Sequence, residues 1–154
     1  MSSIITIKPV TPYSADFERL REESQALGFN MLNRLSTHWL DGSNLFSAPG
    51  EKLLGAFLGN ALVGVCGLNR DPYDETPRAG RVRHLYVSHP VRGVGVGQSL
   101  LSSVTQQAHE FFDYLNTHAP KNAFRFYQRA GFLPVEAHPR ITHRLVFAPS
   151  PNAC

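Results

Sequence analysis

The sequence predicts an α/β (α+β) fold, with one mixed, mostly antiparallel central sheet of about six to seven strands and about four flanking helices. Its apolar pattern reads strand, two helices, three strands, helix, strand, helix and two strands. This order departs from the strict alternation of a doubly wound parallel fold. A length of 154 residues with 42% apolar residues fits a single domain over residues 1–154.

The first elements are a short strand and two helices. Residues 4–7 form the strand, and proline at position 9 ends it. Ser14 caps the first helix and Gly28 ends it. The stripe expected to be buried on that helix consists of Phe17, Leu20, Ser24 and Leu27. The apolar side of the second helix consists of Met31, Leu32, Leu35, Trp39 and Leu40.

The middle of the chain predicts three strands. Residues 53–58 and 61–68 form a hairpin around the turn Gly59-Asn60. Both faces of these strands are apolar, so we expect them at the centre of the sheet. A polar loop over residues 69–80 leads into the next strand, residues 81–87. We interpret its acidic residues, Asp71, Asp74 and Glu75, as a solvated loop.

The C-terminal part predicts a helix, a strand over 112–116, a helix over 121–130, and a closing pair of strands over 132–135 and 142–147. One face of the first of these helices consists of Leu100, Leu101, Val104, Ala108 and Phe111. The residues expected to be buried on the second are Ala123, Phe126 and Ala130.

Composition narrows the function classes. The net charge of +3 is too small to indicate nucleic-acid binding, although five arginines gather in one stretch: Arg70, Arg78, Arg81, Arg83 and Arg92. No apolar run reaches the ~18 residues of a membrane span. Two cysteines and no secretory signal favour a reducing, cytoplasmic location. The histidines lack metal-ligand spacing, so we expect no metal. For His84 and His89 we favour a structural or surface role.

A glycine-rich turn between strand and helix carries the strongest functional signal. Gly93, Gly95 and Gly97 remove side chains where successive backbone N–H groups point at one volume, which suits a phosphate. Arg92 adds a charged donor. The spacing fits neither the G-x-G-x-x-G dinucleotide fingerprint nor the P-loop, which requires a lysine.

Two motifs resemble the GNAT superfamily of N-acetyltransferases. Arg92-x-x-Gly95-x-Gly97 is similar to its (Gln/Arg)-x-x-Gly-x-(Gly/Ala) motif, and residues 123–132 resemble its A-x-x-F-Y-x-x-x-G-F signature. The resemblance covers roughly residues 80–135, the expected cofactor-binding half. It implies a GNAT-like acyl-CoA N-acyltransferase fold, with acetyl-CoA as co-substrate and homodimers as a common state.

The resemblance also implies roles for individual residues. The pyrophosphate of acetyl-CoA would bind at Arg92, Gly93, Val94, Gly95, Val96, Gly97 and Gln98. The pantetheine arm would pair with the main chain of Leu85, Tyr86 and Val87. Tyr127 would protonate the departing CoA thiolate.

The expected function is therefore transfer of acetyl from acetyl-CoA to a primary amine of a small molecule or peptide, by direct attack in a ternary complex. Residues 81–84 supply no carboxylate base, which favours an acceptor amine of low pKa. The alternatives are a non-catalytic acyl-CoA-binding regulatory module and, more weakly, an anion- or nucleic-acid-binding domain built on the arginines. We expect no nucleic-acid or membrane partner.

Overall fold

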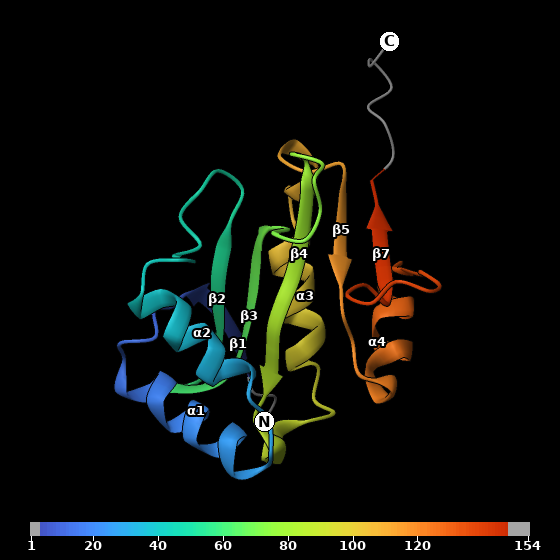
Figure 1. The fold of residues 1–154 in the computed structure, drawn as a ribbon. Helices are drawn as coiled ribbons and strands as arrows, with labels where there is room; N and C mark the ends of the chain where they lie inside the picture. The colour runs from blue at the N-terminus through green and yellow to red at the C-terminus, as the bar shows by residue number, and fades with distance from the viewer. Residues whose placement is uncertain (1–3, 148–154) are drawn as a thin grey trace.

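The computed structural model describes residues 4–147 of the chain. Within this range lies a seven-stranded sheet with the order β1-β2-β3-β4-β5-β7-β6 (Figure 1). The strands are β1 (Ile5–Pro9), β2 (Lys52–Leu58), β3 (Ala61–Arg70), β4 (Ala79–Val87), β5 (Tyr114–Thr117), β6 (Leu133–Pro134) and β7 (His143–Val146). The α-helices are α1 (Ala15–Ala26), α2 (Met31–Leu40), α3 (Val96–Thr105) and α4 (Phe124–Arg129).

The sheet is mixed and mostly antiparallel, as predicted. The β4–β5 pair is parallel, and the other five pairs are antiparallel. The predicted β2–β3 hairpin and the closing β6–β7 pair are both confirmed. Strands β2 and β3 lie inside the sheet because their two apolar faces both need cover.

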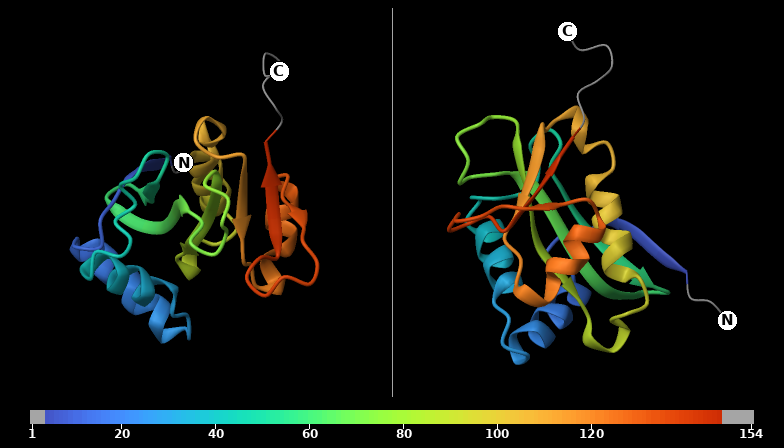
Figure 2. Two further views of the ribbon diagram at one scale, coloured as in Figure 1. Left: turned by 45° about the horizontal axis from the view of Figure 1, so that its top comes forward. Right: turned by 90° about the vertical axis from the view of Figure 1, so that its right-hand side faces the viewer.

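Helices cover both faces of the sheet (Figure 2). Phe17 and Leu20 of α1 and Leu32 and Leu35 of α2 form one core with the strands, to which Tyr86 of β4 belongs. The other core lies under α3 and α4. Its helix residues are Val96, Leu100, Leu101, Val104 and Tyr127. Within residues 4–147 no helix is long and apolar enough to cross a membrane.

The first helix begins and ends as predicted. The Ser14 hydroxyl accepts a hydrogen bond from the Phe17 amide at 3.1 Å, and Gly28 follows the helix with φ +88°. Two predicted core positions are wrong, however. Leu27 and Leu40 are exposed because each lies at the last turn of its helix, beyond the edge of the sheet core.

The helix after the glycine turn is shorter than predicted. α3 ends at Thr105, since Gln107 has φ +61° and cannot continue a helix. Ala108 is still buried, in a short 3-10 turn, whereas Phe111 is exposed. α4 is also shorter, and it buries Tyr127. Ala130, predicted to be buried there, is exposed after the end of the helix, and Ala123 and Phe126 are only partly buried.

Strands β4 and β5 separate after a short paired region. Only Ala79, Gly80 and Arg81 pair with β5, opposite residues 114–116. Beyond Arg81, β4 continues to Val87 without a partner on this side, and the two strands diverge (Figure 1). The backbone of residues 82–87 therefore offers a strand edge to a ligand. Two carbonyls at its ends are already bonded, that of Val82 to the Thr117 hydroxyl at 3.0 Å and that of Val87 to Arg92.

Candidate active site

The glycine turn begins directly after the free edge of β4. Gly93 and Gly95 have φ values of +89° and +90°, the left-handed region that glycine adopts without strain. Gly97 lies in the first turn of α3, where an added Cβ would come within 3.4 Å of the Phe126 ring. The turn therefore needs glycine at two positions for its backbone shape, whereas a side-chain carbon at position 97 would make ordinary van der Waals contact with α4.

The amides of this turn are available to a ligand. The backbone N–H groups of residues 93–98 donate to no protein acceptor within the described residues, and the first helical bond there runs from the Ser99 amide to the Gly95 carbonyl at 3.0 Å. Adjacent unpaired amides at a helix start form a concave anion site. This arrangement can bind phosphate groups.

Arg92 is held against the end of β4. Its Nε donates to the Val87 carbonyl at 3.1 Å, and its guanidinium carbon lies 5.6 Å from the Tyr86 ring centroid. Tyr86 itself is buried in the core on the α1–α2 face, and it pairs with Val65 of β3.

Glu23 of α1 anchors the same strand end. Its carboxylate accepts hydrogen bonds from the Tyr86 hydroxyl and from the Ser88 hydroxyl, the latter at 2.7 Å. Burial alone would raise the pKa of Glu23, but these hydrogen bonds outweigh it and lower that pKa. Burial, with the bond to Glu23, raises the pKa of Tyr86 to about 12. Glu23 thus fixes where β4 ends and the glycine turn begins.

A β-bulge redirects the side chains of β4. Gly67 faces Arg83 while Val65 faces Tyr86, so β4 carries one extra residue, and His84 has φ +61°. Leu85 then packs toward the α3 core, and His84 lies edge-on to Phe46 of the opposite core, at 6.2 Å between ring centroids.

A cleft of about 650 Å³ lies beside the point where β4 and β5 separate. It is lined by residues of α2, the loop before β4, β4, the end of β5 and the chain after it, α4, and the loop between β6 and β7. They include Arg34, Arg83, Leu85, Thr117, Tyr127 and Arg140. A second cavity, of about 290 Å³, lies between α3 and α4 and includes Gln98.

Tyr127 is a buried hydroxyl donor at this cleft. Only 5% of the residue is exposed, and its ring packs edge-on against Phe126 and Phe132 at 5.1 Å and 5.3 Å between centroids. Burial raises its pKa far above the ordinary value, and the nearby Cys66 thiol adds to this. The phenol is therefore protonated at neutral pH and can donate a hydrogen bond.

His84 is neither exposed nor charged near neutral pH. Burial, followed by the charges of Arg83 and Arg34, lowers its pKa to about 3. Within the described residues its Nε2 has no hydrogen-bond partner. Of the two roles predicted, a structural one agrees with this burial, and a surface one does not.

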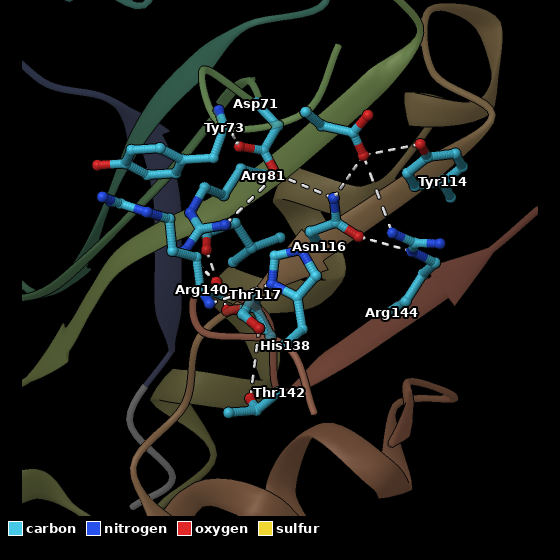
Figure 3. A network of polar contacts seen from close by, with 12 residues as sticks. Asp71, Tyr73, Arg81, Tyr114, Asn116, Thr117, His138, Arg140, Thr142 and Arg144 are labelled. Carbon is cyan, nitrogen blue, oxygen red and sulfur yellow. Dashed lines mark hydrogen bonds and ion pairs between the residues drawn. The ribbon is translucent and has the colours of Figure 1, made fainter. Parts of the chain in front are cut away.

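A network of hydrogen bonds and ion pairs lies where β4 and β5 separate (Figure 3). Arg81 pairs with Asp71 at 3.3 Å and donates to the Arg140 carbonyl at 2.6 Å. Asn116 of β5 donates to the same Asp71 carboxylate at 2.9 Å. These contacts tie the loop before β4, both separating strands and the loop between β6 and β7 together.

The loop before β4 is not the solvated acidic segment that we predicted. Asp71 is 0% exposed. Asp74 accepts from the Tyr114 hydroxyl at 2.7 Å and lies 3.8 Å from Arg144. Burial works to raise the pKa of Asp74, but its hydrogen bonds prevail and lower it. Both carboxylates face internal partners because the closing strand and β5 supply donors to them. Glu75 alone is exposed, as expected.

Comparison with known families accounts for this arrangement. The family model for an acetyltransferase (GNAT) domain matches residues 23–149. The chain belongs to the GNAT acetyltransferase family. A search of curated proteins found no match.

Solved structures share this GNAT fold. A candidate acetyltransferase from Exiguobacterium sp. 255-15 has a TM-score of 0.82 and 28% identity, with 93% of each chain covered. An acetyltransferase of the GNAT family from Streptococcus pneumoniae has a TM-score of 0.62 and 15% identity, over 92% of this chain and 97% of its own. A candidate acyl-CoA N-acyltransferase from Klebsiella pneumoniae has a TM-score of 0.62 and 18% identity, over 94% and 99%.

Within this GNAT domain, the predicted site residues fall into adjacent groups. Leu85 and Tyr127 line the same cleft, and the glycine turn follows at the end of β4. Gln98 lines the cavity between α3 and α4. Among residues 4–147 no cluster of His, Cys, Asp or Glu could hold a metal ion.

Several residues at the GNAT cleft, and Glu23 at the end of β4, gave no local sequence signal. Glu23 looks like any acidic residue on a helix surface, and Arg34 and Arg140 lie far from both motifs. Arg83 did stand in the arginine cluster, within a strand of mostly buried residues, but its direction depends on the bulge.

Proposed function

We propose that this GNAT domain transfers the acetyl group of acetyl-CoA to a primary amine of a small molecule or peptide, by direct attack within a ternary complex. The observation that carries the proposal is the free edge of β4, which leads from the cleft containing Tyr127 to the unpaired amides of residues 93–98.

The residues fit acetyl-CoA along its length. The amides of residues 93–98 suit its pyrophosphate, and the main chain of Leu85 with the N–H group of Val87 suits the amides of the pantetheine arm as an added strand. The thioester would then reach the cleft, where Tyr127 has a hydroxyl to donate.

Tyr127 acts as a hydrogen-bond donor to the leaving sulfur. The amine nitrogen forms the new C–N bond as the C–S bond breaks, and the proton lost by nitrogen is the one that the CoA thiol gains. A phenol whose pKa burial has raised does not give up its proton to a thiolate of pKa about 8.5. It stabilises the charge developing on sulfur by hydrogen bonding, as an oxyanion hole does for oxygen.

The amine must reach the thioester uncharged. Deprotonating a lysine-like amine at pH 7 costs about 4.6 kcal/mol, against about 1 kcal/mol for an α-amine. His84, whose pKa is about 3, is too weak a base to offset the larger cost. An acceptor amine of low pKa in the cleft is therefore favoured.

Calorimetric titration with acetyl-CoA at two salt concentrations, alongside dephospho-CoA, tests the proposal. We expect saturable binding at both, followed by release of free thiol when amines are supplied. Binding of neither compound would overturn the proposal. Binding without turnover for any amine would instead identify a non-catalytic acyl-CoA-binding module.

A further inference from the structure

The wall of the cleft opposite Tyr127 is strongly cationic. Its charged and titratable side chains are Arg34 and His38 of α2, Arg81, Arg83 and His84 of β4, His118 after β5, and Arg140 between β6 and β7. No Asp or Glu is among the described residues that line it. Four guanidinium groups therefore share one cavity with no carboxylate at its surface.

Among residues 4–147, Arg81 alone of these four arginines has a carboxylate partner. Arg81 pairs with the buried Asp71, and Asp71 is also bonded to Asn116. Within the described residues the guanidinium groups of Arg34 and Arg83 make no hydrogen bond or ion pair with the protein. The guanidinium carbon of Arg140 lies 4.1 Å from the Tyr73 ring centroid (Figure 3), and no Asp or Glu in the described part of the chain pairs with it.

Packing keeps these charges close together. Arg83 is half-buried, and burial lowers its pKa. The positive charges of Arg81 and Arg34 lower it further, and together these effects prevail over Tyr73 and Asp71, which raise it. Burial, followed by the charges of Arg83 and Arg34, likewise lowers the pKa of His84. Holding like charges together in a partly buried cavity costs free energy, and an anion bound among them would offset it. Guanidinium forks suit carboxylate and phosphate in particular.

We propose that the acceptor is a primary amine that also carries an anionic group, a carboxylate or a phosphate, bound by Arg34, Arg83 and Arg140. This inference rests on the proposed acetyl transfer and specifies its substrate class. It excludes polyamines and lysine-rich peptides, which this wall would repel.

The same charges assist the chemistry. A positive potential disfavours an ammonium ion relative to the neutral amine, so it lowers the pKa of the bound amine. The anionic group would compensate for part of this potential while it holds the substrate in place. The arginines would thereby supply, through their field, part of what a carboxylate base would otherwise contribute.

The test uses three probes built on one two-carbon amine: β-alanine with a carboxylate, O-phosphoethanolamine with a phosphate, and neutral ethanolamine. The ¹⁵N-labelled protein is first saturated with CoA, so that the glycine turn is occupied. Each probe is then titrated while the arginine Nε–Hε signals are followed by NMR, which detects weak binding.

We expect saturable shifts of the Arg34 and Arg83 signals with at least one anionic probe and none with ethanolamine. The probe that binds more tightly distinguishes carboxylate from phosphate recognition. Arg34→Gln and Arg83→Gln should each weaken that binding by about tenfold, since each removes a charged hydrogen bond. Arg34 is exposed on α2, so its replacement should leave the fold intact.

Arg19→Gln is the matched control, because it removes one exposed positive charge of α1 outside the cleft. It should change probe affinity less than twofold. The inference is overturned if no anionic probe binds saturably, if ethanolamine binds as tightly, or if Arg34→Gln matches Arg19→Gln. Failure of CoA itself to bind would overturn the proposed function instead.

Discussion

Tyr127 combines burial with a hydroxyl group at the cleft. Its ring packs among Phe126, Phe132 and His143, which leaves little freedom for the phenol. Such fixed donors stabilise developing charge without reorganising during the reaction. The residue therefore fits a role in turnover better than a role in binding the CoA body.

Replacing Tyr127 with Phe should lower kcat by about 100-fold, the typical loss for one transition-state donor. Acetyl-CoA affinity should change less than twofold, because the ring packing is kept. Thiol release and calorimetric titration measure the two effects. Tyr13→Phe, at an exposed tyrosine, is the control, and an unchanged kcat in Tyr127→Phe would remove the proposed role.

Glu23 links α1 to the end of β4 by accepting from Tyr86 and Ser88. Glu23→Gln should reduce the free energy of unfolding at pH 7 by about 1–2 kcal/mol, because charged hydrogen bonds become neutral ones. Chemical denaturation at several pH values measures this. Glu22→Gln, an exposed neighbour on the same helix, should have little effect.

The effect of Glu23 should depend on pH in a defined direction. Its pKa in the folded chain lies below the ordinary value of 4.5. Its contribution to stability is therefore complete above about pH 5 and is lost as the pH falls through the folded value. The difference in free energy of unfolding between wild type and Glu23→Gln should therefore become smaller in acid. A difference that became larger there would contradict this assignment.

At the scale of elements, the bulge in β4 and its separation from β5 create the cleft. The bulge turns Arg83 and His84 toward α2, and the separation leaves the edge of residues 82–87 open. The glycine turn then starts α3 with its amides unpaired. Three local irregularities of the backbone, in consecutive segments, thus build one surface.

Gly95→Ala should test the glycine turn. The left-handed φ of +90° makes alanine unfavourable by about 1–2 kcal/mol, although no atom lies within 4 Å of an added Cβ. We expect a lower melting temperature and acetyl-CoA binding weakened at least about tenfold, as the amides reorient. Differential scanning calorimetry and titration measure these effects.

Gly42→Ala is a close control for that variant. Gly42 has φ +80°, with equally open space around it, at the end of α2. It should lose similar stability while acetyl-CoA affinity is preserved. Equal losses of affinity in both variants would show that general destabilisation, and not the shape of the turn, weakens binding.

At the scale of the whole molecule, the Asp71–Arg81 network holds the two halves of the sheet in their diverging arrangement. Its members come from the loop before β4, from β4, from β5 and from the loop between β6 and β7. Because Arg81 also bonds to the Arg140 carbonyl, the same network positions one wall of the cleft.

Arg81→Met should destabilise the protein by about 3–5 kcal/mol, since it leaves the Asp71 carboxylate buried without its cation. Arg78→Met, which breaks an exposed pair with Asp113, should cost less than about 1 kcal/mol. Denaturant unfolding of both variants measures the contrast. Similar losses of stability in the two variants would mean that burial of the Arg81–Asp71 pair does not increase its contribution to stability.

Local patterns predicted much of this molecule. Apolar periodicity identified the hairpin and both helices of the N-terminal half, and Ser14 and Gly28 marked the ends of α1. The motifs around Gly95 and Tyr127 indicated the GNAT family. These features depend on neighbouring residues, whose spacing follows directly from helix and strand periods.

Other features depend on contacts between distant segments. The end of α3 at Thr105, the burial of Asp71 and the anchoring of β4 by Glu23 were not predicted. Each depends on which hydrogen-bond donor or apolar surface a distant part of the chain places beside the residue. In the sequence alone, a buried polar residue cannot be distinguished from a solvated one.

The sequence by itself therefore determined the order of elements, the family and the glycine turn, because those are encoded in short-range spacing. Only the tertiary structure decided that Arg34, Arg83 and Arg140 meet across one cleft, since they lie on a helix, a bulged strand and a loop. Which charged side chains line a cavity depends on how such elements pack, and this packing cannot be inferred from a local sequence pattern.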